Sequence, residues 1–322
     1  MNYNYLGDTG VRVSELGFGT MSFGGDADKE TSAEIYKAVR DTGINYFDTA
    51  DHYNHGLSET YLGEFSEHER KNLVLSTKFY FPTSDDVNDR GTSRKHLFEN
   101  IHHSLKRLKT DYIDILFIHR FDENTSLEET LRALDDLIKS GEILYIGASN
   151  FATWQVMKAQ GISMREGFSR IKCIQPMYSL VKRQAEVELL PMALSEKIGV
   201  VSYSPLGAGM LTGKYNKNTT PGNGRLVSNE MYKVRYGNDG MLDTAGKFTD
   251  FAEKNGFNPA ALAVRWAASH KAVTCPLIGA RNIEQLKGSL EALNIDMTEE
   301  LRAEISVLSP EPASATDRNE EK

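Results

Sequence analysis

The sequence contains little cysteine and no long run of apolar residues. Its 322 residues include only two cysteines, Cys173 and Cys275, which do not form a C-x-x-C pair. This spacing argues against a disulfide framework and against a zinc site. No apolar stretch reaches the roughly 18 residues that a membrane-spanning helix needs, and the N-terminus lacks the basic and apolar regions of a secretory signal. We therefore expect a protein of a reducing compartment, the cytoplasm.

The sequence also lacks an excess of basic residues and several catalytic motifs. Its 37 Lys and Arg against 45 Asp and Glu give a net charge of −8, which disfavours nucleic acid and anionic membranes as partners. Neither H-E-x-x-H nor G-x-S-x-G occurs, so the hydrolases that these motifs mark are not indicated, and no metal is expected. With 40% hydrophobic and 25% charged residues, the composition is that of an ordinary globular protein.

Eight short, mostly apolar segments alternate with segments of helical periodicity, the pattern that gives parallel strands joined by helices. The expected strands are Leu16–Met21, Asn45–Thr49, Leu73–Lys78, Ile113–His119, Ile143–Ser149, Cys173–Tyr178, Gly199–Tyr203 and Val273–Gly279. They predict a (β/α)8 TIM barrel, an α/β fold, with residues 1–309 as a single domain and the polar residues 310–322 as a mobile tail. An open doubly wound sheet is the alternative. It is disfavoured because Ser22 replaces the last glycine of G-x-G-x-x-G after the first strand.

Local signals mark the expected helix ends. Thr31 and Glu34 have the spacing of a capping box, in which a hydroxyl and a carboxylate satisfy N–H groups at the helix start. Ser126 and Glu129 have the same spacing. Glycine readily adopts the left-handed conformation that ends many helices, and it follows three helical segments, at Gly43, Gly141 and Gly199. These signals place helices between consecutive strands.

The connection after the seventh strand is much longer than the others. Roughly 35 residues rich in Gly, Asn and Tyr separate Leu206 from Met241, whereas such loops usually have about 2–6 residues. A barrel places this connection on the face formed by the C-terminal ends of its strands, where active sites are built. We interpret the segment as a flap over a cofactor.

Four polar residues stand at or just after the ends of neighbouring expected strands. Asp48 ends the second strand, and Tyr53 follows it in the loop. Lys78 ends the third strand and His119 the fourth. One such residue alone is usually a cap, a surface cation or a structural histidine. Four of them at successive strand ends of a barrel indicate a catalytic group.

Seven segments in order along the chain resemble the aldo-keto reductases. They are FDTADHY at 47–53, LSTK at 75–78, SLKRLKTDYIDILFIHR at 104–120, GASN at 147–150, QPMYS at 175–179, YSPLGAGMLTGKY at 203–215 and PLIGARNIEQL at 276–286. The resemblance covers nearly the whole chain. It implies the barrel fold, a nicotinamide dinucleotide, most often NADPH, and reduction of an aldehyde or ketone to the alcohol. It also implies a catalytic tetrad of Asp48, Tyr53, Lys78 and His119.

The chemistry of carbonyl reduction suits these four residues. The cofactor supplies a hydride, and a neighbouring group must supply a proton to the carbonyl oxygen. Tyr53 is the expected general acid, although the ordinary pKa of a tyrosine, about 10, is high for this role. A Lys78 ammonium about 4 Å away would stabilise the phenolate by roughly 4 kcal/mol, about three pK units, unless burial of the tyrosine offsets the effect. We expect Asp48 to keep Lys78 charged and His119 to hydrogen-bond the carbonyl oxygen.

The resemblance implies a set of cofactor-binding residues as well. They are Gly19, Thr20, Met21, Asp48, Ser149, Asn150, Gln175, Tyr203, Ser204, Pro205, Leu206, Gly207, Gly209, Lys214, Gly279, Ala280, Arg281 and Gln285. The polar side chains on the fifth and sixth strands suit the nicotinamide carboxamide, and Tyr203 would stack on the nicotinamide ring. The glycine-rich stretch that follows would wrap the pyrophosphate through its N–H groups. It is not a P-loop, because Tyr215 stands where a Ser or Thr is needed.

Arg281 opens the last helix of the barrel and is the expected partner of the 2′-phosphate of NADP. Gln285, one turn on, would contact the adenine ribose. At one position the sequence departs from the family, since Ser289 stands where an Asn near the adenine is usual. The adenine contacts are therefore less well defined than the phosphate contacts.

Two aspects of function stay open at this stage. A nicotinamide-binding regulatory subunit with slow turnover is the alternative to an enzyme, although a complete tetrad favours the enzyme. The substrate is a small carbonyl compound, and aldoses, small aldehydes and ketones all fit, in either direction of the reaction. Aromatic and apolar residues expected at the mouth of the site are Met21, Phe23, Tyr80, Phe81 and Phe121, with Arg120 and Asp122 shaping the loop beside them.

Overall fold

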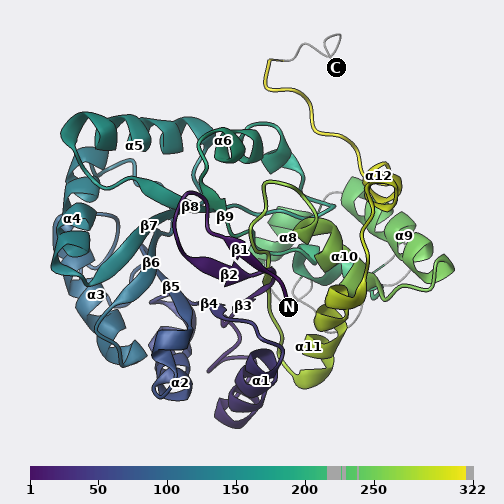
Figure 1. The fold of residues 1–322 in the computed structure, drawn as a ribbon, viewed down its shortest axis with the longest axis horizontal. Helices are drawn as coiled ribbons and strands as arrows, with labels where there is room; N and C mark the ends of the chain where they lie inside the picture. The colour runs from purple at the N-terminus through teal and green to yellow at the C-terminus, as the bar shows by residue number, and fades with distance from the viewer. Residues whose placement is uncertain (216–225, 227–229, 238, 317–322) are drawn as a thin grey trace.

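The computed structural model describes residues 1–215, 226, 230–237 and 239–316. Part of the expected flap and the end of the expected tail lie outside the described residues. Within them, a parallel sheet of eight strands has the order β10-β3-β4-β5-β6-β7-β8-β9, as Figure 1 shows. The bounds are β3 Gly17–Gly19, β4 Tyr46–Asp48, β5 Val74–Phe79, β6 Ile113–Ile118, β7 Ile143–Ser149, β8 Ile171–Gln175, β9 Gly199–Val200 and β10 Leu277–Ile278. Every expected strand is confirmed, in order.

The sheet closes into a barrel where β9 meets β10, the two strands at the ends of the sheet order. The N–H of Cys275 donates to the carbonyl of Val200 over 3.1 Å, and that of Leu277 donates to Ser202 over 2.8 Å. These bonds join the segment after β9 to the segment that enters β10. The fold is therefore the predicted (β/α)8 barrel, which has no free sheet edge.

Helices surround the barrel (Figure 1). The α-helices are α1 Lys29–Asp41, α2 Leu57–Ser66, α3 Arg94–Leu108, α4 Leu127–Ser140, α5 Thr153–Glu166, α6 Leu189–Ser195, α8 Glu230–Tyr236, α9 Asp239–Lys254, α10 Pro259–Ala268, α11 Ile283–Leu290 and α12 Glu299–Ser306. Short 3-10 helices are η1 Tyr53–Gly56, η2 Arg70–Asn72, η3 Gln184–Glu186, η4 Gly207–Thr212 and η5 Glu291–Asn294. Each barrel strand is thus followed by at least one α-helix before the next strand or the tail. The expected flap contains η4 and α8 and reaches the start of α9.

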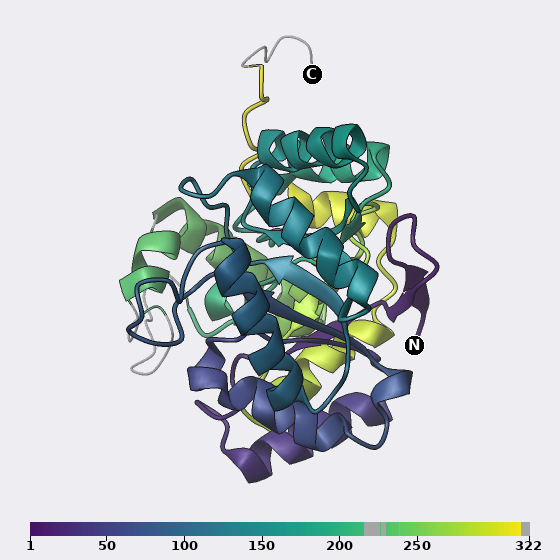
Figure 2. The ribbon, with the colours of Figure 1, turned by 90° about the vertical axis from the view of Figure 1, so that its left-hand side faces the viewer.

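A hairpin at the N-terminus, which the sequence analysis did not anticipate, covers one end of the barrel. Its strands are β1 Tyr3–Tyr5 and β2 Arg12–Ser14, paired antiparallel. Leu6 and Val13 are fully buried and belong to the cluster that fills the barrel interior. Figure 2 shows the hairpin at one end of the barrel and the green helices that follow β9 at the other. The face on which the sequence predicts the active site is therefore opposite the hairpin.

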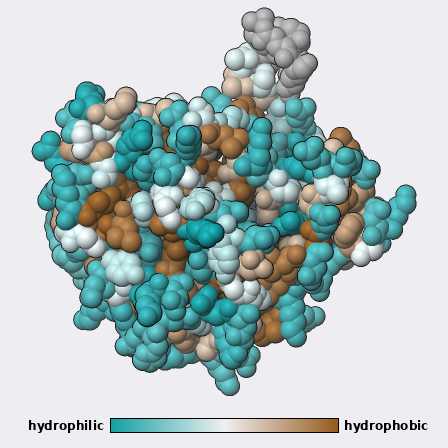
Figure 3. All heavy atoms as spheres, in the orientation of Figure 1, coloured by the Kyte–Doolittle hydropathy of each residue, from teal (hydrophilic) through white to brown (hydrophobic). Residues whose placement is uncertain are grey.

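The core has two layers. One lies inside the barrel, and the other lies between the strands and the surrounding helices. Seen from the hairpin end, hydrophilic residues cover most of the outer helices, while apolar residues show in the hollows between them (Figure 3). No helix among the described residues is long and apolar enough to cross a membrane.

The helix signals are confirmed in part. Ser126 caps α4 by accepting from the N–H of Glu129 over 3.2 Å, but the Glu129 carboxylate accepts from the N–H of Arg94, at the start of the preceding helix α3, instead of completing a box. The prediction at Thr31 and Glu34 is wrong, because α1 begins earlier. Its cap is Asp28, whose carboxylate accepts from the N–H of Thr31.

The predicted left-handed glycines are also confirmed in part. Gly43 and Gly141 have φ of 90° and 84° after α1 and α4. The prediction at Gly199 is wrong, because Lys197 takes the left-handed conformation, with φ of 54°. Gly199 is needed for space instead, since a Cβ there would lie 2.7 Å from the side chain of Leu6 in the hairpin.

Candidate active site

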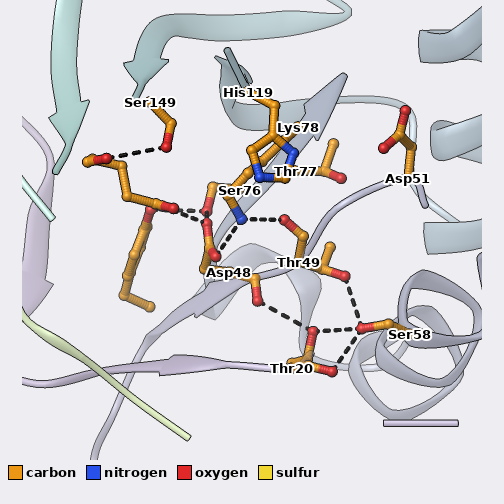
Figure 4. Close-up of polar contacts among 12 residues, drawn as sticks. Thr20, Asp48, Thr49, Asp51, Ser58, Ser76, Thr77, Lys78, His119 and Ser149 are labelled. Atoms are coloured by element: carbon orange, nitrogen blue, oxygen red, sulfur yellow. Dashed lines mark hydrogen bonds and ion pairs between the residues drawn. The ribbon is translucent and has the colours of Figure 1, made fainter. Parts of the chain in front are cut away.

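A buried ion pair lies at the C-terminal ends of β4 and β5. Asp48 and Lys78 are 3% and 0% exposed, and the Lys78 Nζ donates to the Asp48 Oδ2 over 2.5 Å and to the carbonyl of Thr49 over 2.6 Å. The other carboxylate oxygen of Asp48 accepts from Ser76 and from Gln175. Figure 4 shows Lys78 pointing toward Asp48 and Thr49, with His119 beside it. Every oxygen of this carboxylate therefore has a partner, as a buried charge requires.

The charge of Lys78 is maintained by its surroundings. Burial lowers the pKa of this lysine, but the Asp48 carboxylate and the Tyr53 phenol outweigh burial, so the pKa lies above its ordinary value. Lys78 is an ammonium at neutral pH.

The structure brings Tyr53 to this ammonium. The Lys78 Nζ lies 5.1 Å from the centroid of the Tyr53 ring. Burial raises the pKa of Tyr53, while the charge of Lys78 and its hydrogen bond to the phenol lower it. From the sequence we expected the charge of Lys78 to lower the pKa of Tyr53, unless burial of the tyrosine offset this effect. Burial does more than offset it, since the pKa of Tyr53 lies above the ordinary 10.0, and the phenol keeps its proton at neutral pH.

The loop that holds Tyr53 has an unusual backbone. Asn54, His55 and Gly56 have positive φ values of 49°, 55° and 85°, a conformation that costs free energy for residues other than glycine. The Asn54 side chain fixes the loop, because its Nδ2 donates to the carbonyls of Met21 and Phe23, each over 2.8 Å. Tyr53 is thus anchored to the segment after β3.

His119 follows β6 and faces the same space. Its ring centroid lies 6.1 Å from that of Tyr53. Burial and the charge of Lys78 hold the pKa of His119 well below its ordinary range, so the ring is neutral. Its Nδ1 is buried without a hydrogen-bond partner among the described residues. A neutral imidazole beside a phenol can donate one hydrogen bond to a carbonyl oxygen.

Sequence reasoning missed two residues next to Tyr53. Asp51 is 1% exposed, and its carboxylate accepts from the backbone N–H of His52 over 2.7 Å and from the Asn100 Nδ2 over 2.6 Å. The ring of His52 lies 5.1 Å from that of His119 and 4.8 Å from that of Phe81. The signal was the polar pair directly before Tyr53 in FDTADHY. These residues support the Tyr53 loop and line the site.

The residues expected at the nicotinamide are brought together around Asp48. Ser149 ends β7 and donates to the carbonyl of Gln175, which ends β8. The Asn150 Oδ1 accepts from the Tyr203 hydroxyl over 2.7 Å, and its Nδ2 donates to the carbonyl of His119 over 2.9 Å. Tyr203 lies after the end of β9, bridged to Met177. All four residues border the face that carries Tyr53 and His119.

The glycine-rich stretch after Tyr203 has several residues in the left-handed backbone conformation. Positive φ values occur at Ser204, Gly207, Ala208 and Gly209, whereas Pro205 and Leu206 between them have none. The N–H groups of Gly207 and Gly209 donate within the loop, to the carbonyls of Ser204 and Leu206, each over 2.9 Å. A Cβ at Gly207 would lie 2.6 Å from the side chain of Val181, and one at Gly209 would lie 3.0 Å from Lys214. Glycine at these two positions keeps the loop compact and leaves room for the Lys214 side chain beside it.

The first and last barrel strands supply the remaining wall. A Cβ at Gly279 would lie 3.5 Å from the carbonyl of Gly19, so the ends of β3 and β10 approach closely. Thr20 is buried and donates to the carbonyl of Asp48 over 3.1 Å, as Figure 4 shows. Met21 is 37% exposed, and the carbonyl of Ala280 accepts from the Ser22 hydroxyl over 2.6 Å.

The expected phosphate site at the start of α11 already has protein partners. Gln285 accepts from the backbone N–H of Arg281 over 3.2 Å. The Nε of Arg281 forms an ion pair with Asp26 over 2.9 Å. Ser289, where the family usually has Asn, is buried at 1% exposure, and its hydroxyl has no partner among the described residues.

The mouth differs from the sequence-based expectation. Phe23 is 0% exposed and packs on Phe18 and Phe65 in the core, so its assignment to the mouth is wrong. Phe81 contacts the rings of His52, His119 and Tyr80. Further out, Phe121 packs against Phe151 and the 61% exposed Trp154.

The loop after β6 is held by a buried aspartate, as expected for a residue that shapes the rim. Asp122 is 8% exposed and accepts from the N–H groups of Thr92 and Asn124. The Asp122 carboxylate therefore holds the loop together, and its burial and hydrogen bonds need no catalytic role to explain them. Arg120 beside it is exposed.

A family model described as the aldo/keto reductase family matches residues 15–309. The chain belongs to the aldo/keto reductase family. It is accordingly an oxidoreductase that uses a nicotinamide cofactor, NADH or NADPH, and acts on small carbonyl compounds. Both the fold class and the resemblance stated from the sequence are confirmed.

Named relatives of this aldo/keto reductase cover nearly its full length. An uncharacterized oxidoreductase of Bacillus subtilis strain 168 is 37% identical over 327 residues, covering 98% of both chains. A probable voltage-gated potassium channel subunit beta of Arabidopsis thaliana is 35% identical over 303 residues, covering 92% of both. A Schizosaccharomyces pombe protein named as a candidate aryl-alcohol dehydrogenase is 32% identical over 332 residues, covering 92% of this chain and 93% of that protein.

Proposed function

We propose that this protein reduces an aldehyde or ketone, sugar-like carbonyls included, to the alcohol with NADPH, and that Tyr53 is the general acid. The observation that carries the proposal is the position of the Lys78 ammonium, held by Asp48 and lying 5.1 Å from the centroid of the Tyr53 ring. A cation at this position stabilises the phenolate that forms as the phenol gives up its proton. The catalytic residues are then Asp48, Tyr53, Lys78 and His119.

Each residue has a defined part in the proton transfer. Tyr53 enters the reaction as a neutral phenol, because its pKa lies above 10.0, and donates its proton to the carbonyl oxygen. Lys78 lowers the free energy of the phenolate that remains, and Asp48 keeps Lys78 charged. The neutral His119 donates a hydrogen bond to the same carbonyl oxygen and orients it.

The cofactor contributes the hydride when bound. We assign Ser149, Asn150, Gln175 and Tyr203 to its nicotinamide end, since they lie on the face that carries Tyr53. The stretch from Ser204 to Gly209, with Lys214, would hold the pyrophosphate. Gly19, Thr20, Met21, Gly279 and Ala280 would form the wall between the two, Gln285 the ribose contact, and Arg281 the contact to the 2′-phosphate that favours NADPH.

Replacement of Tyr53 by Phe tests the catalytic assignment. We expect turnover of aldehydes to fall by a factor of about 10² to 10⁴, the usual contribution of a general acid, because the proton donor is lost. The dissociation constant of NADPH, measured by fluorescence titration, should stay unchanged. Tyr61→Phe on α2 removes a hydroxyl outside the site and is the matched control. Near-normal turnover by Tyr53→Phe would contradict the assignment.

Replacement of Arg281 by Ala tests the cofactor assignment. NADPH binding should weaken by about 1.5–3 kcal/mol, the usual size of a charged hydrogen bond, with little change for NADH. Calorimetric titration with both cofactors measures the two effects in the same protein. Equal losses for NADPH and NADH would remove the phosphate-binding role of Arg281.

A regulatory subunit is the second candidate function, because a relative that shares 35% identity is named a probable potassium channel subunit beta. Such a subunit would bind NADPH and turn it over slowly. The presence of Asp48 and His119 beside Lys78 and Tyr53 favours an enzyme, because a subunit that only binds the cofactor does not need a proton donor. Consumption of NADPH with a panel of aldehydes, followed by absorbance, separates the two functions, and slow turnover of every aldehyde with tight NADPH binding would favour the subunit.

The remaining assignments follow from the sequence and the family match. We propose that residues 1–309 form one domain and that the tail from residue 310 is not part of it. The cytoplasmic location stays a prediction from the sequence.

A further inference from the structure

The guanidinium of Arg281 is paired with a carboxylate from a distant part of the chain. The Arg281 Nε lies 2.9 Å from the Asp26 Oδ2, with the two side chains 35% and 51% exposed. Asp26 belongs to the connection between β3 and α1, whereas Arg281 follows β10. A negative group of the protein thus sits at the cation that the proposed function assigns to the 2′-phosphate.

The turn that carries Asp26 is held in place by several hydrogen bonds. Gly24 and Ala27 pair across it, since the N–H of Gly24 donates to the carbonyl of Ala27 over 2.9 Å. The N–H of Ala27 donates to the carbonyl of Ser22, also over 2.9 Å. The Ser22 hydroxyl ties the turn to the carbonyl of Ala280, next to Arg281. These bonds hold the backbone at Asp26 close to Arg281, whether or not the ion pair is formed.

We propose that Asp26 is a specificity-determining residue that limits the preference of this protein for NADPH over NADH. The proposal rests on the role of Arg281 proposed above. To bind Arg281, the 2′-phosphate has to replace the Asp26 carboxylate on the guanidinium, and it then lies beside a second negative charge. NADH carries no such phosphate and meets neither cost.

Replacement of Asp26 by Asn removes the charge and keeps the shape of the side chain. The dissociation constant of NADPH should decrease two- to fivefold, the change expected when an exposed ion pair of ordinary strength no longer competes. The dissociation constant of NADH should change less than twofold. The effect on NADPH should shrink as the ionic strength rises from about 0.01 to 0.15 M, because salt screens exposed charges. Isothermal titration calorimetry measures all of these constants directly, without reference to turnover.

Two further variants make the test specific. Glu284→Gln on α11 removes one negative charge close to Arg281 along the chain. Within the described part of the chain Arg281 pairs with Asp26 and not with Glu284, so the dissociation constant of NADPH should change less than in Asp26→Asn. In an Arg281→Ala background, Asp26→Asn should have a smaller effect on NADPH, because the competition for the guanidinium is gone and only the repulsion between the Asp26 carboxylate and the 2′-phosphate remains.

The outcomes separate this inference from the proposed function. If Arg281→Ala weakens NADPH selectively but Asp26→Asn changes nothing, the inference is refuted and the role of Arg281 stands. If Glu284→Gln tightens NADPH as much as Asp26→Asn does, general charge explains the result and the inference is also refuted. If Arg281→Ala weakens both cofactors equally, the phosphate role of Arg281 fails and the inference fails with it.

Discussion

Replacement of Lys78 by Met should damage stability and catalysis together, for two different reasons. The variant leaves the Asp48 carboxylate, which is 3% exposed, with Ser76 and Gln175 as partners but without its counter-charge. Removing one partner of a buried ion pair typically costs about 3–5 kcal/mol of unfolding free energy, because an uncompensated charge stays in the interior. We expect a loss of this size for Lys78→Met.

The catalytic loss follows from the distance between Lys78 and Tyr53. With the charge 5.1 Å from the ring centroid and an effective dielectric constant near 20, the ammonium stabilises a phenolate by about 3 kcal/mol, or a factor of roughly 200 in rate. Single-turnover reduction of an aldehyde at saturating NADPH measures this factor. The dissociation constant of NADPH serves as the check that the cofactor still binds.

The double variant Asp48→Asn with Lys78→Met separates the two effects. Its amide still accepts from Ser76 and Gln175 but carries no charge, so its unfolding free energy should return to within about 1–2 kcal/mol of the parent protein. Its turnover should stay as low as in Lys78→Met. Urea unfolding followed by fluorescence gives the free energies. If the single variant proves as stable as the double variant, Asp48 and Lys78 are not a buried pair and the reasoning is refuted.

Two other predictions concern stability. Burial lowers the pKa of His270 from 6.5 to about 4, so between these pH values the unfolded chain binds more protons and the unfolding free energy decreases as the pH falls. His270→Gln should reduce this pH dependence, measured by urea unfolding at several pH values, and an unchanged dependence would argue against it. Leu6→Ala should cost about 2–5 kcal/mol, because it leaves a cavity at the hairpin end of the barrel. Calorimetry should find NADPH binding unaltered, and weakened binding would show that the hairpin influences the opposite face.

The strands, and the polar residues at or just after their C-terminal ends, could be predicted from the sequence because both depend on local pattern. Apolar segments of the right length mark buried parallel strands. The strands of such a barrel all end on one face, so polar residues at the ends of β4, β5 and β6 had to come close together. The roles proposed for Asp48, Tyr53, Lys78 and His119 came from the resemblance to the aldo-keto reductases, supported by the chemistry of these residue types. No three-dimensional information was needed for this step.

Other features depend on contacts between distant segments and could not be predicted. The hairpin has two strands of three residues with no marked pattern, and its role as a plug appears only when Leu6 and Val13 meet the barrel interior. Gly199 was misread as a helix end because its reason is the neighbouring Leu6. Phe23 was misplaced at the mouth because an aromatic residue after a strand can turn either inward or outward.

The sequence by itself determined the barrel, the order of its elements and the residue types at the ends of its strands, because these depend on periodicity and on the geometry of parallel strands. Only the tertiary structure decided that burial outweighs Lys78 in the pKa of Tyr53 and that Asp26 pairs with Arg281. Both the pKa of Tyr53 and the Asp26–Arg281 ion pair depend on the charge and burial of groups that are far apart in the sequence. No local sequence pattern predicts them.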